Sequence, residues 1–227
     1  MRRVEQIMGL PITIDIPQGR DEADLAAVFD RFRDIDQRFS TYKADSEVSK
    51  FGRGEIAETK LSLELKQVLK ACRAWQTKTD GYFSAWAAGQ FDPSGYVKGW
   101  AIAEAGKQIE KAGYKTYCLS AGGDILARSA GAKSWSVGIQ DPADPSKILN
   151  KLSISNGGVA TSGNYERGAH IINPKTGRPA QVLQSVTITG PDIITADVLA
   201  TAVFAAGLTA GRQILENFAG YEAFILA

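Results

Sequence analysis

The chain has 227 residues, of which 44% are hydrophobic and 22% charged, as in an ordinary globular protein with room for one large domain or two small ones. Its 26 Lys and Arg residues nearly balance its 25 Asp and Glu residues, which argues against a nucleic-acid-binding protein, because such proteins normally carry a basic excess. Two cysteines without a CxxC pair and a single histidine exclude zinc fingers and thiol-redox motifs.

The first half of the chain is predicted to be mainly helical. Residues 10–16 alternate apolar and polar side chains, which predicts a half-buried strand. Apolar residues at helical spacing predict helices over 21–38 and 63–78, and the polar residues 39–55 between them predict a loop. A third helix is expected over 96–112.

The second half is predicted to contain short strands followed by helices. Gly, Asp-Pro and Asn-Gly sequences separate four β-prone segments, which are 115–120, 134–140, 147–155 and 184–190. An Ala-rich helix is expected over 195–207, a further helix near 209–218, and a final strand over 221–226. This order predicts a single α+β domain over residues 1–227, with mixed or antiparallel sheets and helices packed at their sides.

No segment of the sequence predicts a membrane span or a signal peptide. The residues after Met1 lack a long apolar run, and no stretch approaches the roughly 18 apolar residues that a spanning helix needs. We therefore expect a cytoplasmic protein.

The first of four polar clusters lies at the start of the helix expected over 96–112. An Asp-Pro-Ser-Gly turn, residues 92–95, leads directly into that helix. Free N–H groups at a helix start, together with the cation of Lys98, are typical of an anion site. A capped helix with a surface lysine is the alternative interpretation.

The second cluster is the sequence Ser-Ala-Gly-Gly-Asp at residues 120–124. Paired glycines allow a positive φ angle and a close approach of the backbone to a ligand. They also suit a plain hairpin turn between two strands, which is the interpretation that we favour.

The third cluster contains the only histidine of the chain. Residues 159–167 are rich in Gly, Ser and Thr and predict a loop, and an Asn-Pro-x-x-Gly turn begins at Asn173. His170 lies between them, where its imidazole could carry a proton near neutral pH. A structural, hydrogen-bonded histidine is equally consistent with this position.

The fourth cluster places a carboxylate in an apolar helix. Asp197 and Thr201 are four residues apart in the helix expected over 195–207, so they share one face. A carboxylate in such surroundings is costly unless it is paired or binds a cation, and oxygen ligands favour Mg²⁺ or Ca²⁺ over zinc. The alternative is an aspartate near a helix start, stabilised by the helix dipole.

Taken together and in order, these clusters resemble the ApbE family of flavin transferases. The resemblance runs from Met8-Gly9 to Asp197–Thr201 and rests on motifs that recur in the same order. The intervening motifs are the sequences FSTY at 39–42, SEVS at 46–49, DGYF at 80–83, DPSGYVKG at 92–99, GGD at 122–124, ATSG at 160–163 and HIINPKTG at 170–177.

The resemblance implies a fold and an activity. A member of this family binds FAD with Mg²⁺ on its diphosphate, transfers FMN through a phosphoester bond to a Thr or Ser hydroxyl of a target flavoprotein, and releases AMP. The metal would be held by Asp197, Thr201 and the backbone carbonyl of Gly95, and His170 and Asp197 would be the catalytic residues. Contacts with FAD would come from Met8, Tyr42, Tyr82, Phe83, Ser84, Asp92, Lys98 and Ile171.

Some positions depart from the family pattern and keep two other functions open. Ser84 stands where the family usually has Asp, and Ala200 where some members have a further acidic metal ligand. The same site could hydrolyse FAD to FMN and AMP, with water as the acceptor. With fewer acidic groups, it could also bind FAD without cleaving it, as a carrier.

Overall fold

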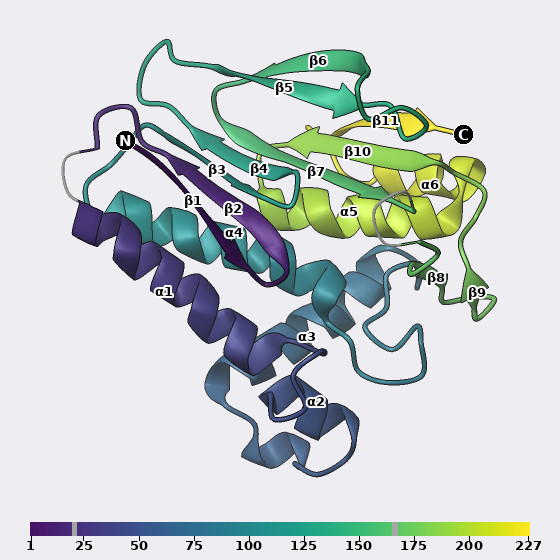
Figure 1. The fold of residues 1–227 in the computed structure, drawn as a ribbon. Helices are drawn as coiled ribbons and strands as arrows, with labels where there is room; N and C mark the ends of the chain where they lie inside the picture. Colours follow the sequence, from purple (N-terminus) through teal and green to yellow (C-terminus); the bar gives the residue numbers. More distant parts are fainter. Residues whose placement is uncertain (20–21, 165–167) are drawn as a thin grey trace.

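One large sheet and the helices on one of its faces make up most of the molecule (Figure 1). The computed structural model describes residues 1–19, 22–164 and 168–227. The seven-stranded sheet has the strand order β1-β2-β3-β4-β7-β10-β11, and every neighbouring pair is antiparallel. Its edge strands come from opposite ends of the chain, and this mixed helical and antiparallel architecture confirms the predicted α+β class.

The sheet is built from two tight hairpins and three further strands. The first hairpin joins β1 (Arg2–Ile7) and β2 (Leu10–Asp15), and the second joins β3 (Tyr117–Ala121) and β4 (Asp124–Arg128). The remaining strands are β7 (Gly157–Gly163), β10 (Ser185–Gly190) and β11 (Glu222–Leu226). Gly122 and Gly123 have φ angles of 56° and 89°, which confirms the hairpin turn predicted for this pair.

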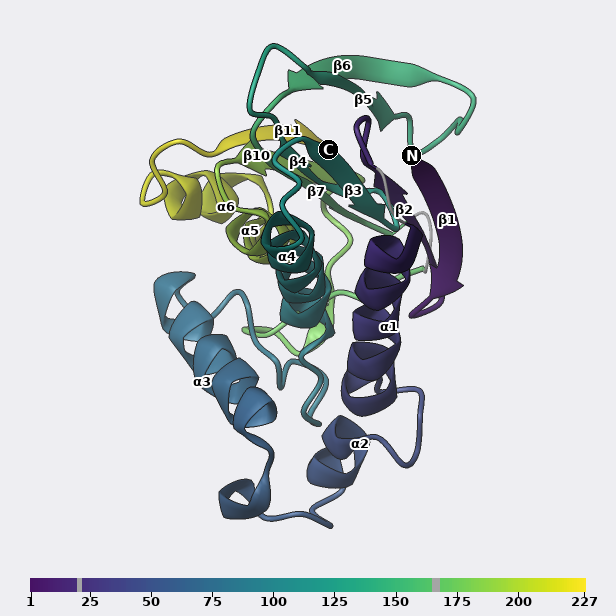
Figure 2. The same ribbon diagram turned by 90° about the vertical axis from the view of Figure 1, so that its left-hand side faces the viewer.

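Four helices cover one face of the sheet, as both ribbon views show (Figures 1 and 2). They are α1 (Glu22–Phe39), α4 (Ser94–Lys111), α5 (Ile193–Ala206) and α6 (Leu208–Leu215). Helix α1 buries the apolar stripe that predicted it, since Leu25, Phe29 and Ile35 are at most 1% exposed. Helix α5 is apolar on all sides because it lies between β7, β10, α4 and α6.

A hairpin covers the other face of the sheet. Strands β5 (Trp135–Gln140) and β6 (Ile148–Ile154) form this two-stranded unit, and Val137 and Ile154 pack against Val159 of β7. A second small hairpin, β8 (Ile172–Asn173) with β9 (Arg178–Pro179), lies near the end of α5. Among the described residues, no helix combines the length and the apolar character that crossing a bilayer requires.

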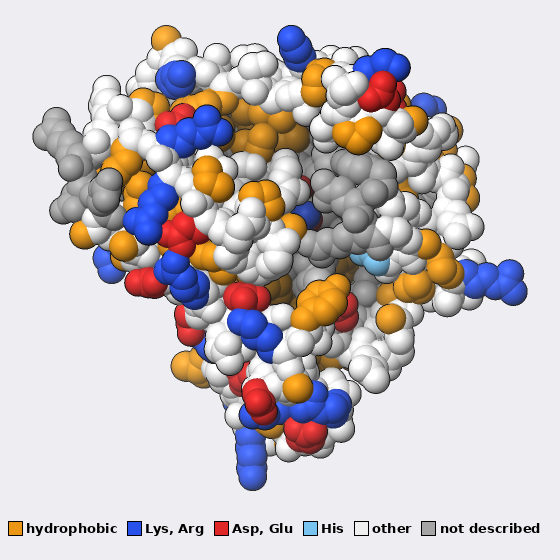
Figure 3. All heavy atoms as spheres, in the orientation of Figure 1, with side chains coloured by type: hydrophobic (Ala, Val, Ile, Leu, Met, Phe, Trp, Pro, Cys, Tyr) orange, Lys and Arg blue, Asp and Glu red, His pale blue; other side chains and the backbone are white. Residues whose placement is uncertain are grey.

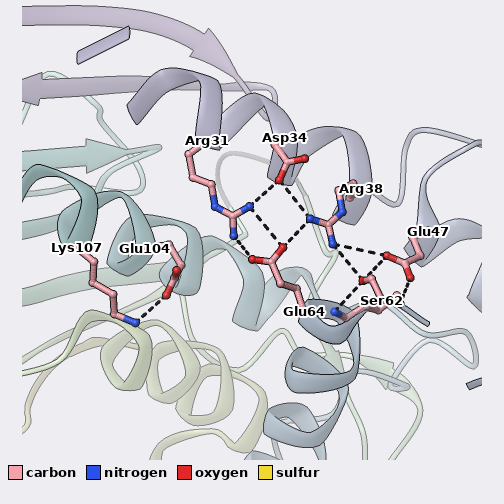
Figure 4. Close-up of polar contacts among 9 residues, drawn as sticks. Arg31, Asp34, Arg38, Glu47, Ser62, Glu64, Glu104 and Lys107 are labelled. Carbon is pink, nitrogen blue, oxygen red and sulfur yellow. Dashed lines mark hydrogen bonds and ion pairs between the residues drawn. The ribbon is translucent and has the colours of Figure 1, made fainter. Parts of the chain in front are cut away.

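The remaining helices lie beyond the four that cover the sheet (Figure 2). They are α2 (Glu47–Gly52), the 3₁₀ turn η1 (Glu58–Lys60) and α3 (Leu63–Lys78). An ion-pair network ties α3 to α1 (Figure 4). In this network the carboxylate of Glu64 accepts hydrogen bonds from Arg31 at 2.5 Å and from Arg38 at 2.6 Å.

Several elements differ from the predictions, among them α2, β7 and β1. Residues 39–55 contain the helix α2, because Ser46 caps it by accepting a hydrogen bond from the Ser49 N–H and Val48 is buried. Much of the loop predicted over 159–167 is the end of β7, whose small side chains leave room for α5; residues 165–167 lie outside the described part of the chain. Strand β1 was not predicted, because its side chains are mostly exposed and show no apolar stripe.

Candidate functional site

The predicted site residues line one cavity of about 250 Å³. The cavity lies where the tip of the β1–β2 hairpin, the start of α4, the end of β7 and the middle of α5 meet. Figure 3 shows the hollowed face, with the single histidine in pale blue beside it. The predicted residues that line it are Met8, Tyr42, Tyr82, Phe83, Ser84, Asp92, Gly95, Lys98, His170, Ile171, Asp197 and Thr201.

Two residues of a cluster of three charges, Lys98 and Asp197, line this cavity, and the third, Asp124, pairs with Lys98. The ammonium group of Lys98 lies 2.7 Å from Oδ2 of Asp124 and 3.3 Å from Oδ1 of Asp197. The Lys98 side chain is 24% exposed, whereas those of Asp124 and Asp197 are 0% and 2% exposed. Lys98 is therefore not the surface lysine of the alternative interpretation, but the cation that accompanies two buried carboxylates.

Backbone N–H groups fix the two carboxylates from behind. Oδ1 of Asp124 accepts a hydrogen bond of 3.0 Å from the N–H of Thr161, and Oδ2 of Asp197 accepts one of 2.7 Å from the N–H of Gly99. The other oxygen of each carboxylate is the one that contacts Lys98. Asp197 lies in the second turn of α5, because Asp192 is the N-cap, so the helix dipole alone does not explain its burial.

Burial changes the proton affinity of these groups. For Asp197, burial raises the pKa, because the loss of hydration and the neighbouring charge of Asp124 outweigh the attraction of Lys98. For Lys98, burial acts to lower the pKa, but the two carboxylates outweigh it and the pKa is raised. Lys98 therefore keeps its positive charge at neutral pH.

The oxygen atoms near Asp197 suit a hard cation. Oγ of Ser162 lies 3.4 Å from Oγ1 of Thr201, and a Cβ added at Gly95 would lie 3.5 Å from the same Thr201 oxygen. Carboxylate, hydroxyl and backbone oxygens are the ligand types that Mg²⁺ takes, usually together with water and substrate phosphates. Within the described residues, no group of three or more His, Cys, Asp or Glu side chains could hold a metal ion by itself. The residues present therefore fit Mg²⁺ only if substrate or water oxygens complete its shell.

The aromatic residues of the cavity differ in how much they expose. The Tyr42 side chain lies at the mouth with 89% of its surface exposed, whereas the Phe83 ring is only 2% exposed and lies in the cavity floor. Tyr82 carries a cation on its ring, because Nζ of Lys175 lies 4.2 Å from the ring centroid. Lys175 is in turn held by Asp80 through an ion pair of 2.6 Å.

The start of α4 is a capped turn. The carboxylate of Asp92 accepts a hydrogen bond of 2.9 Å from the N–H of Ser94 and another from the Ser94 hydroxyl. A carboxylate of the chain itself thus occupies the first free donor of the helix, where the sequence predicted an anion site.

His170 is exposed and oriented by the backbone. Its Nδ1 lies 2.9 Å from the carbonyl oxygen of Gly168, which can only accept a hydrogen bond. This contact places the proton of the neutral ring on Nδ1 and leaves Nε2 able to accept one.

Asp124 is a residue of the site that the sequence did not predict. The Gly-Gly pair before it was explained by the hairpin turn, and the turn is there, but the next residue is a fully buried charge. A signal was present, since Asp124 occupies the first position of a short strand of otherwise mostly apolar residues. A charged residue at a buried strand position indicates a partner elsewhere in the fold.

Comparisons with known proteins agree on one family. The model of the ApbE family matches residues 8–90 and 85–225. A curated FAD:protein FMN transferase from Haemophilus influenzae is 30% identical over 139 residues, which cover 56% of this chain and 40% of that protein. The chain thus aligns with less than half the length of this relative.

The fold is shared with solved structures over nearly the whole chain. The ApbE protein from Thermotoga maritima superposes with a TM-score of 0.82 at 23% identity, covering 99% of this chain and 93% of that one. The flavin transferase ApbE from Vibrio cholerae superposes with a TM-score of 0.84 at 19% identity, covering 100% and 97% of the two chains.

Proposed function

The chain belongs to the ApbE family, and on this premise we propose that it transfers FMN from FAD to a Thr or Ser hydroxyl of a target flavoprotein and releases AMP. The observation that carries the proposal is the cavity whose lining combines Lys98, Asp197 and Thr201 with aromatic side chains. A dinucleotide with two aromatic ends and a charged diphosphate needs this combination. The curated relatives that match part of the chain are named for the same transfer.

The reaction exchanges the phosphoanhydride bond of FAD for a phosphoester bond to the acceptor. The acceptor oxygen forms a bond to the phosphorus on the flavin side of the diphosphate. The bond from that phosphorus to the AMP oxygen breaks, and its electron pair leaves with AMP. The hydroxyl proton must go to a base, so the site has to hold the diphosphate, neutralise its charge and accept one proton.

Asp197, Thr201 and the backbone carbonyl of Gly95 are the proposed holders of Mg²⁺. When bound, Mg²⁺ would neutralise the diphosphate charge as the bond to AMP breaks. Asp197 contributes Oδ1, since the Gly99 N–H already engages Oδ2. Lys98, which keeps its proton, supplies a fixed positive charge to the same phosphate oxygens.

His170 is the proposed base. Its Nδ1 contact with the Gly168 carbonyl fixes the tautomer that leaves Nε2 free to accept the acceptor proton. Asp197 is catalytic only through the cation that it holds.

The remaining lining residues are proposed to bind FAD. Tyr42 and Tyr82 offer ring faces on which an aromatic ring system can stack, and Phe83 and Ile171 supply apolar floor. Met8, Ser84 and Asp92 complete the contacts at the rim. We also propose a cytoplasmic location, with the two free cysteines Cys72 and Cys118 as support.

Mass spectrometry tests this function directly. The protein is incubated with FAD, MgCl₂ and a flavoprotein domain that carries an acceptor threonine, and the domain is weighed. We expect a gain equal to FMN as a phosphoester, lost in Asp197→Ala and kept in Asp30→Ala, which removes an exposed carboxylate of α1. The acceptor with its threonine replaced by valine should gain nothing.

The same incubation separates the two other functions. Free FMN and AMP without an adduct would identify an FAD hydrolase. Intact FAD, retained by the protein after gel filtration, would identify a carrier. Either result would contradict the transfer.

A further inference from the structure

The two carboxylates of the buried cluster share one ammonium group unequally. Lys98 lies closer to Asp124, at 2.7 Å, than to Asp197, at 3.3 Å. The Asp197 oxygen that it approaches is Oδ1, the one that the Gly99 N–H leaves free. The lysine therefore stands beside the carboxylate oxygen of Asp197 that the Gly99 N–H does not engage.

Asp124 balances this arrangement. Asp124 is fully buried, begins β4 and accepts a hydrogen bond from the N–H of Thr161. Its carboxylate therefore has a fixed position relative to Lys98. Two carboxylates and one ammonium leave one negative charge in the cluster. Without Asp124, Lys98 would have Asp197 as its only acidic partner within ion-pair distance among the described residues, and the pair would be neutral.

We infer that Lys98 competes with the metal ion for Oδ1 of Asp197, and that Asp124 is a positioning residue that holds the ammonium group back and keeps this oxygen available. The inference rests on the proposed metal site and concerns Asp124, which would bind neither metal nor FAD. In the absence of the metal, the ammonium group of Lys98 occupies part of the metal site. Metal affinity is then set by a residue outside the metal shell.

Substitutions of Asp124 and of Lys98 should change the Mg²⁺ affinity in opposite directions. Asp124→Asn leaves Lys98 to neutralise Asp197, so Mg²⁺ binding should weaken by about tenfold. Lys98→Met removes the competing cation, so Mg²⁺ binding should tighten, while FAD binding weakens because a phosphate contact is lost. Structural damage would instead weaken both ligands in both variants.

The double variant Lys98→Met/Asp124→Asn distinguishes competition from a change in charge. Its cluster carries one negative charge, as in the native protein, but no ammonium group stands beside Asp197. It should therefore bind Mg²⁺ more tightly than the native protein, whereas an effect of net charge alone would leave the affinity at the native value. If Asp124 supported the site only by packing, the double variant would bind as weakly as Asp124→Asn alone.

Isothermal titration of the full chain with MgCl₂, without FAD, measures these affinities. Lys107→Met removes an exposed lysine of the same helix and Asp30→Asn an exposed aspartate of α1, so both are matched controls and should bind as the native protein does. Far-ultraviolet circular dichroism and thermal unfolding establish that each variant is folded. A second titration, with FAD, completes the comparison for Lys98→Met.

The outcomes separate this inference from the proposed function. Unchanged Mg²⁺ affinity in Asp124→Asn, or a double variant as weak as that single variant, would overturn the competition. So would a native protein that transfers FMN but binds no Mg²⁺ on its own. The expected pattern in a protein that forms no FMN adduct would uphold the competition and overturn the proposed transfer.

Discussion

The backbone N–H of Gly99 in α4 donates a hydrogen bond of 2.7 Å to Oδ2 of Asp197 in α5. The contact is possible because Gly99 has no side chain. A Cβ at this position would lie 2.9 Å from Cβ and 3.0 Å from Oδ2 of Asp197. The close approach of the two helices therefore fixes the orientation of the carboxylate at the centre of the site.

Gly99→Ala should damage both the fold and the site. Alanine normally stabilises a helix by about 1 kcal/mol relative to glycine, but here the methyl group has to displace Asp197, and overpacking of this kind costs about 1–3 kcal/mol. We expect a lower thermal midpoint and loss of FMN transfer. Gly52→Ala in α2 is the control, because the nearest atom to its Cβ among the described residues would lie 3.6 Å away. Equal melting of the two variants would contradict the close approach.

Met8 occupies a left-handed backbone conformation at the tip of the β1–β2 hairpin, with a φ angle of 59°. A residue with a Cβ pays about 1 kcal/mol for this conformation, so Met8→Gly should be more stable than Met8→Ala by about that amount. Both variants remove the side chain that lines the cavity and should weaken FAD binding equally. Urea unfolding and FAD titration measure the two effects, and equal stabilities would show that the turn is unstrained.

Lys175 holds the ring of Tyr82 against the cavity from a different segment of the chain. Lys175→Met should raise the KM for FAD several-fold and leave kcat nearly unchanged, because the lysine orients a wall of the pocket and does not touch the diphosphate. The stability should be nearly unchanged, as for other exposed ion pairs. Lys133→Met removes a comparable cation from the ring of Trp135 and should alter neither constant. A fall in kcat would show that Lys175 acts on the chemical step.

Glu64 should make folding stability depend on acid. Burial acts to raise its pKa, but hydrogen bonds from Arg31 and Arg38 outweigh this and hold the pKa below the ordinary 4.5. The folded protein therefore binds this proton more weakly than the unfolded chain does. The stabilisation is present above pH 4.5 and is lost as the pH falls through the lower, folded value.

Urea unfolding at pH 6.5 and at lower pH measures this contribution. Glu64→Gln should lower stability by about 1 kcal/mol at pH 6.5, and its difference from the native protein should shrink towards zero in acid. Glu222→Gln, at an exposed position of β11, is the control and should follow the native curve. A Glu64→Gln curve parallel to the native one would exclude the arginine network as the cause.

The main helices and most of the polar and aromatic residues that line the cavity could be predicted from the sequence, for different reasons. The apolar stripe of α1 and the uniformly apolar sequence of α5 indicate which faces of these helices are buried. Both helices begin and end within two residues of the predicted bounds. The candidate site residues were predicted from the family resemblance that the ordered motifs carry. Spacing alone could not have brought Met8 and Asp197 to one cavity, because that contact depends on the whole sheet.

Asp124 and β7 show where sequence interpretation stops. A Gly-Gly turn has a sufficient local explanation, and although the charge at the start of β4 indicates a partner, the local sequence does not identify Lys98 of α4 as that partner. The small residues of β7 resemble a loop because their strand character comes from pairing with β4 and β10 and from the helix packed on them. In both places a tertiary contact decides the structure, and local propensity does not contain it.

The hydrogen bond between Gly99 and Asp197 joins residues 98 positions apart in the chain, which has a consequence for biosynthesis. A ribosome that has released α4 and β4 has made the lysine and one carboxylate of the cluster, but not the residue that closes it. Long-range contacts of this kind form late, after the elements that they join have been completed. The proposed metal site therefore cannot be complete before α5 docks against α4.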